Sequence, residues 1–144
     1  MRFDTESSRN LFNFRVKTSR YEGRVTIRNA VLINYYVALI FGLILIFTGI
    51  AGFLIPQDRA LTSGAPAYNV FHIFFGLLAL VLVSSSHETC IRVFNVGFGL
   101  IDLYQAVASR MSWFPAAQFR WKGADDILHV LIGLALVIIG LLPV

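Results

Sequence analysis

Apolar residues occur along this chain in four long runs, which short polar or turn-rich segments separate. The first run covers 31–55 and holds no charged residue, and the others cover about 68–83, 91–108 and 127–142. A helix needs roughly 20 apolar residues to cross about 30 Å of hydrocarbon. The pattern therefore predicts four transmembrane helices within 31–144, preceded by an N-terminal arm over 1–30.

An internal repeat supports this count. A shift of 57 residues lays 41–44 on 98–101 with four identities, and the same shift lays His72 on His129 and Gly76 on Gly133. One offset thus aligns the first run with the third and the second with the fourth. We expect two tandem, similar helical hairpins that form an all-α, four-helix, up-down transmembrane bundle.

Composition excludes most soluble functions. The chain of 144 residues is 57% hydrophobic and only 14% charged, against about 25% charged in a typical soluble domain, and its mean hydropathy is +0.72. The single cysteine, Cys90, has no partner for an internal disulfide. No nucleotide-binding loop, nucleophile elbow or zinc-protease motif occurs. We therefore expect neither an enzyme nor a nucleic-acid-binding protein.

Positive charge is concentrated in the N-terminal arm. Seven of the twelve Lys and Arg residues lie within the first thirty residues: Arg2, Arg9, Arg15, Lys17, Arg20, Arg24 and Arg28. Because basic segments stay on the cytoplasmic side, the N-terminus is predicted to be cytoplasmic, in a bacterial inner or photosynthetic membrane. The arm is expected either to lie along anionic lipid headgroups or to dock on a partner subunit.

The strongest chemical signal is a pair of histidine patterns in the second and fourth runs. Each histidine has a polar residue at i−3 and a glycine at i+4: Asn69, His72 and Gly76, then Asp126, His129 and Gly133. Three interpretations stay open: hydrogen-bonded packing, axial ligation of haem b or chlorophyll beside Gly76 and Gly133, and a small proton or metal site. Two histidines alone are a weak metal signal.

Asp102 adds a carboxylate to the third run, where an isolated charge costs a few kcal/mol. It is predicted to be protonated or paired, or to act as a proton acceptor beside the histidines. The expected polar centre contains Asn69, His72, Asp102, Asp126 and His129.

At the two histidine patterns the sequence resembles an uncharacterised bacterial family, domain-of-unknown-function family 4383. The resemblance covers roughly 34–142 and rests on Asn69, His72 and Gly76, then on Asp125 or Asp126 with His129 and Gly133. It implies a small four-helix membrane protein and no activity. The arm lies outside the resemblance, and Asp102 is not assigned by it.

These features predict a non-catalytic accessory or assembly subunit of a larger membrane protein complex, in contact with the lipid bilayer. The alternative is a haem- or chlorophyll-binding subunit of a photosynthetic or respiratory electron-transport complex, with His72 and His129 as axial ligands.

Overall fold

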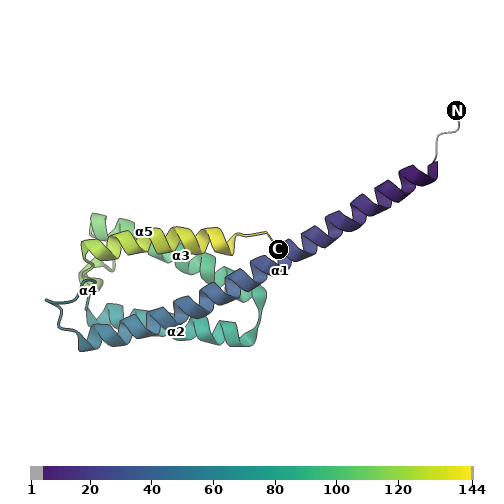
Figure 1. The fold of residues 1–144 in the computed structure, drawn as a ribbon. Coiled ribbons are helices and arrows are strands. Elements are labelled where there is room, and N and C mark those ends of the chain that lie inside the picture. Colours follow the sequence, from purple (N-terminus) through teal and green to yellow (C-terminus); the bar gives the residue numbers. More distant parts are fainter. Residues whose placement is uncertain (1–4, 144) are drawn as a thin grey trace.

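The computed structural model of this chain describes residues 5–143, with side chains from residue 22 onward, and this part is helical with no strand (Figure 1). The helices are α1 (Thr5–Leu54), α2 (Pro66–Ser85), α3 (Glu88–Met111), α4 (Ala116–Phe119) and α5 (Gly123–Gly140). Within the described part, four helical segments are long and apolar enough to cross a membrane: Glu22–Leu54, Pro66–Ser85, Glu88–Met111 and Gly123–Gly140. The prediction of four such helices is confirmed.

The helices are longer than the apolar runs. α5 begins at Gly123 rather than near 127, because Asp125 Oδ2 accepts a hydrogen bond from the Lys122 backbone N–H at 2.7 Å and caps the first turn. α4, a single turn within the segment between α3 and α5, was not expected.

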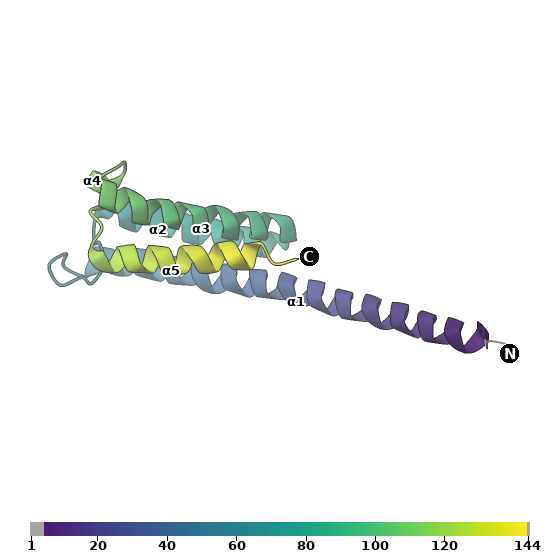
Figure 2. The same cartoon turned by 90° about the horizontal axis from the view of Figure 1, so that it is seen from above.

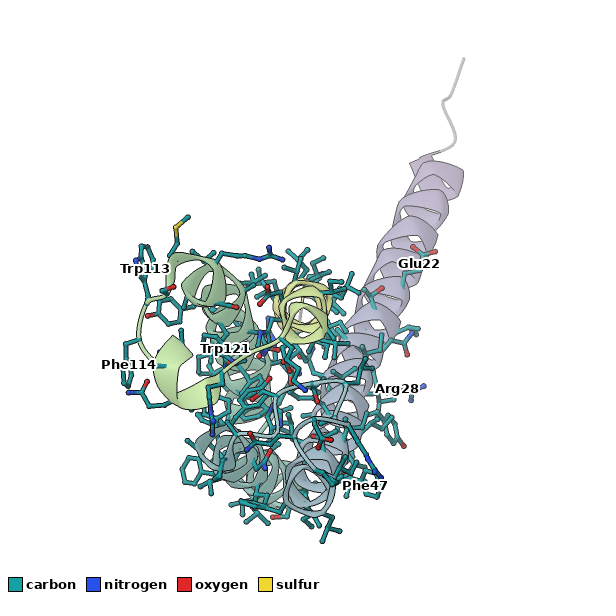
Figure 3. All side chains as sticks on the ribbon, turned by 90° about the vertical axis from the view of Figure 1, so that its left-hand side faces the viewer. Glu22, Arg28, Phe47, Trp113, Phe114 and Trp121 are labelled. Atoms are coloured by element: carbon teal, nitrogen blue, oxygen red, sulfur yellow. The ribbon has the colours of Figure 1, made fainter. Side chains whose placement is uncertain are left out.

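The predicted arm and the first span form one continuous helix. α1 projects well beyond the other helices in two perpendicular views (Figures 1 and 2). Along the described side chains of α1, Ala30 is the first buried one, so packing begins at the predicted boundary although the helix does not break there. Glu22 and Arg28 are exposed on the projecting part (Figure 3).

The bundle has two different ends. The distal end carries the loop 55–65 and α4, and it lies opposite the projecting half of α1 (Figures 1 and 2). The arm end carries the loop between α2 and α3 and the C-terminus.

Glycines bring the two helices of each hairpin into close contact. A Cβ atom on Gly76 of α2 would lie 2.7 Å from the Gly42 carbonyl oxygen of α1, and one on Gly99 of α3 would lie 2.7 Å from the Gly133 carbonyl oxygen of α5. Only glycine allows such an approach. The 57-residue shift relates these two contacts to one another, as expected for a duplicated hairpin.

Aromatic side chains, rather than glycines, fill the space between the hairpins. The Phe98 ring of α3 lies 5.2 Å from that of Phe41 and 5.1 Å from that of Phe75, measured between centroids. These rings belong to the hydrophobic core that joins the hairpins. Large apolar side chains such as Phe47 (74% exposed) point outward (Figure 3), a surface suited to lipid rather than water.

Candidate functional site

A hydrogen bond joins the two hairpins in the interior of the distal half of the bundle. Tyr68, in the first turn of α2, places its hydroxyl 2.7 Å from Nε2 of His129, in the second turn of α5. Both residues are almost fully buried, with 3% and 4% of their surfaces exposed. Sequence reasoning missed Tyr68. Its position at i−4 from His72, on the same helical face, was the available signal.

The second histidine meets the first through this tyrosine. The rings of Tyr68 and His72 lie 4.1 Å apart between centroids, and His72 is partly buried. His72 and His129 are close enough to influence one another electrostatically. The structure therefore brings the two predicted histidines together around a residue that was not predicted.

A polar side chain of α3 completes what we call the Tyr–His centre: Tyr68, His72, Asp102 and His129. Asp102 and Gln105 are 4% and 2% exposed, and Asp102 lies close enough to Tyr68 to act on it electrostatically. Nδ1 of His129 is buried without a hydrogen-bond partner among the described residues, and so is Oε1 of Gln105, one turn after Asp102 on α3. The centre thus retains hydrogen-bonding capacity that the described residues do not use.

Aromatic residues of the segment between α3 and α5 cover the distal side of the centre. The Trp121 ring lies 5.7 Å from that of His129, and the Phe119 ring lies 5.3 Å from that of Tyr68. In the view onto this end, Trp121 lies toward the middle, whereas Trp113 and Phe114 lie at the rim (Figure 3). The centre is therefore closed toward the distal end.

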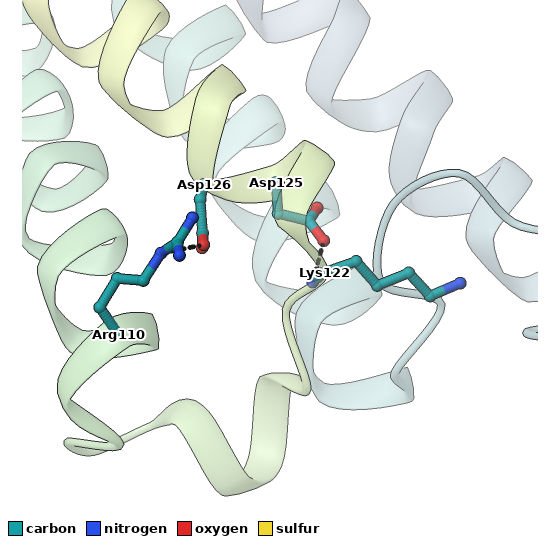
Figure 4. A network of polar contacts seen from close by, with 4 residues as sticks. All are labelled: Arg110, Lys122, Asp125 and Asp126. Carbon is teal, nitrogen blue, oxygen red and sulfur yellow. Dashed lines mark hydrogen bonds and ion pairs between the residues drawn. The ribbon is translucent and has the colours of Figure 1, made fainter.

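Asn69 and Asp126, two of the residues expected in the polar centre, each make a polar contact at a helix end. Asn69 Nδ2 donates to the Gly64 carbonyl at 3.3 Å. Asp126 Oδ2 pairs with Arg110 Nε at 2.8 Å, across the distal ends of α5 and α3 (Figure 4). These two positions correspond under the repeat, so in both hairpins the residue three before the histidine has a partner outside the Tyr–His centre, while Asp126 stays close enough to His129 to act on it electrostatically.

The neighbouring carboxylate, Asp125, points the other way and binds the loop 55–65 (Figure 4). Its Oδ2 accepts hydrogen bonds from the backbone N–H groups of Ser63, at 2.8 Å, and of Lys122. Lys122 Nζ donates to the carbonyl oxygens of Gln57, at 2.8 Å, and Ala60. These contacts fasten the first hairpin to the start of α5.

The geometry around the histidines does not suit a tetrapyrrole. Gly76 and Gly133 were expected to leave room for a macrocycle. The space beside them is filled by the backbones of Gly42 and Gly99. Nε2 of His129, the nitrogen nearest Tyr68, is already hydrogen-bonded. In the described part of the chain, no three His, Cys, Asp or Glu side chains gather closely enough to hold a metal ion.

A second polar contact, also missed from sequence, lies at the arm end. Asn95 Nδ2 donates to Asn34 Oδ1 at 2.9 Å, and Asn34 Nδ2 donates to the Ile139 carbonyl at 2.9 Å. Both asparagines are buried. Together they join α1, α3 and α5, so each end of the bundle has a hydrogen-bonded link between the hairpins.

Comparisons with known proteins found no relative of this chain: no family model, no curated protein and no solved structure matches it. The resemblance to family 4383 therefore stays a prediction.

Proposed function

We propose that this chain is a non-catalytic integral membrane protein that serves as an accessory or assembly subunit of a larger membrane complex. The observation that carries the proposal is the continuity of α1, which extends from the bundle as one helix back to Thr5. Such a helix leaves the membrane along the axis of the first span rather than lying flat on the headgroups. It is therefore placed to meet a partner at a distance, roughly 35 Å for 25 residues at the helical rise.

The division of polar and apolar residues supports the same function. The buried polar side chains described above mostly join helices to one another, and the outward faces of the spans are apolar. Contacts with other molecules are then left to the lipid-facing surfaces and the projecting helix. The basic residues of the arm favour a cytoplasmic position for it, with the four spans in up-down order across a bacterial inner or photosynthetic membrane.

The alternative, a haem- or chlorophyll-binding subunit, is supported by the convergence of His72 and His129 on one buried place. It requires Tyr68 to release His129 and the glycine contacts to open. We rank it second for that reason.

The experiment compares the full chain with a variant lacking residues 2–29, both purified from the native membrane in mild detergent and separated by native electrophoresis. We expect the full chain to migrate within a larger complex and the truncated chain to migrate as the bundle alone, with both resisting alkaline extraction from the membrane. Equal migration of the two would contradict a docking role for the arm.

An absorption spectrum of the same preparations tests the alternative. A Soret band or a red chlorophyll band that disappears in a His72→Ala, His129→Ala double variant would replace the accessory function with cofactor binding. A colourless native protein would exclude the alternative.

A further inference from the structure

The outer face of the second hairpin contains a groove between α3 and α5. Its volume is about 530 Å³, within the range of small-molecule sites. The lining residues are Ala106, Val107, Arg110, Met111, Asp126, Ile127, Val130 and Leu131. All but Arg110 and Asp126 are apolar. These two residues lie in the last turn of α3 and the first turn of α5, so the charged pair is at the distal end of the groove.

The groove exists because the second hairpin lacks two glycines of the first. Under the 57-residue shift, Gly49 and Gly52 of α1 correspond to Ala106 and Ser109 of α3. In the first hairpin these glycines let α2 approach closely, since a Cβ on Gly49 would lie 2.7 Å from the Asn69 carbonyl oxygen. Ala106 and Ser109 carry side chains at the corresponding positions of α3, so the α5 backbone cannot lie against the α3 backbone there as α2 lies against α1. The repeat therefore closes this space in one hairpin and leaves it open in the other.

Arg110 is held at the mouth of the groove with its terminal nitrogens unused. Asp126 binds Nε, and the Arg110 side chain is 71% exposed (Figure 4). Apart from Asp126, no described residue accepts a hydrogen bond from the Arg110 guanidinium. The remaining oxygen of Asp126, Oδ1, is buried, so a molecule arriving from outside meets the guanidinium rather than the carboxylate.

The position of Arg110 suits a lipid headgroup. Trp113 and Phe114 follow α3 directly and are 53% and 76% exposed. Exposed aromatic side chains at the end of a membrane span typically lie at the level of the headgroups. The guanidinium of Arg110 is then at the depth of lipid phosphates, while the apolar part of the groove lies beside the acyl chains.

We infer that this groove binds an anionic phospholipid, with an acyl chain against Val107, Val130 and Leu131 and the phosphate on Nη1 and Nη2 of Arg110. Guanidinium binds phosphate through paired, charge-assisted hydrogen bonds. Charge complementarity favours an anionic headgroup, because the basic residues of this end (Arg59, Arg110, Arg120 and Lys122) outnumber its carboxylates (Asp58, Asp125 and Asp126). The inference rests on the membrane insertion proposed above.

The test is native mass spectrometry of the full chain in detergent with added phosphatidylglycerol or phosphatidylcholine of identical acyl chains. We expect one retained phosphatidylglycerol on the wild type. Arg110→Gln is expected to reduce its retention about tenfold, to the phosphatidylcholine level, through loss of charged hydrogen bonds. Val130→Trp, which fills the groove, is expected to remove both lipids.

Two control variants match these changes outside the groove. Arg59→Gln removes an exposed positive charge from the loop 55–65, and Ile138→Trp adds the same ring to an exposed position (63%) farther along α5. Both are expected to retain lipid as the wild type does. Helix content by circular dichroism identifies any variant that fails to fold.

Equal retention of the two lipids by the wild type, or wild-type retention by both Arg110→Gln and Val130→Trp, would overturn the inference. A lipid-free dimer would also overturn it, by assigning the groove to a second copy of this chain. Alkaline extraction from membranes is measured separately, so a chain that does not insert is distinguished from one that inserts without binding lipid.

Discussion

The Tyr68 hydroxyl and Nε2 of His129 lie 2.7 Å apart, in residues that belong to different hairpins and are both nearly inaccessible. A hydrogen bond between two buried groups stabilises the fold less than the removal of one of them destabilises it, because the remaining group stays buried without a partner. In a bundle whose hairpins meet mainly through aromatic side chains, this contact determines how the two hairpins fit together at the distal half.

Replacing Tyr68 by Phe is therefore expected to lower the free energy of unfolding by about 1–3 kcal/mol, since His129 would be left buried without its partner. Thermal unfolding in detergent measures the loss. Tyr36→Phe is the matched control, because the Tyr36 side chain is exposed on α1. Equal effects of the two substitutions would show that the hydrogen bond contributes nothing to stability.

Gly99 and Gly97 provide a second comparison, two residues apart on α3. A Cβ on Gly99 would lie 2.7 Å from the Gly133 carbonyl oxygen, whereas one on Gly97 has nothing within 4 Å. Gly99→Ala is expected to destabilise the protein by about 1–3 kcal/mol through forced separation of α3 and α5. Gly97→Ala is expected to be neutral or to stabilise it by up to about 1 kcal/mol through higher helix propensity.

The same thermal measurement checks this pair of glycine variants. If Gly97→Ala destabilised the protein as much as Gly99→Ala, close contact between α3 and α5 would not explain the need for glycine.

The asparagine pair at the arm end should behave as one unit. A double-mutant cycle with Asn34→Ala and Asn95→Ala is expected to give a coupling energy of about 0.5–2 kcal/mol, as for other hydrogen bonds between membrane helices. Asn34 and Asn69 make no hydrogen bond to each other, and a cycle between them should be additive. Additivity of the Asn34–Asn95 cycle would mean that the two side chains do not interact in the folded protein.

Asp125 should hold the loop 55–65 in place. Its Oδ2 accepts from the backbone N–H groups of both Ser63 and Lys122, so Asp125→Ala is expected to cost about 1–2 kcal/mol as a lost cap. It should also make the loop more susceptible to limited proteolysis. Asp58→Ala changes an exposed carboxylate of the same loop and should leave the cleavage rate unchanged. Identical cleavage of the two variants would refute the tether.

Part of the candidate site was readable from the sequence. Histidines and a carboxylate within apolar runs are costly in lipid, so they must lie inside the bundle, and His129 and Asp102 do. Tyr68 was missed, because an aromatic residue in an apolar run is equally compatible with lipid contact and with packing, and its position at i−4 from His72 was the one signal that favoured packing. Sequence spacing put Asn69 and Asp126 on the helical face of the histidines but did not predict their partners, the Gly64 carbonyl and Arg110, because spacing does not identify the neighbour that a face meets.

The number of helices long enough to cross a membrane, the continuity of the apolar runs and the repeat follow from the sequence alone, because hydrophobic length and identity at a fixed shift are properties of the chain. The tertiary structure decided which polar atoms meet. The Arg110–Asp126 ion pair depends on where the segment between α3 and α5 brings two helix ends, and the groove depends on how closely those helices approach. Both are set by distances between segments remote in the chain, and a substitution of glycine by alanine changes those distances without altering the hydropathy pattern.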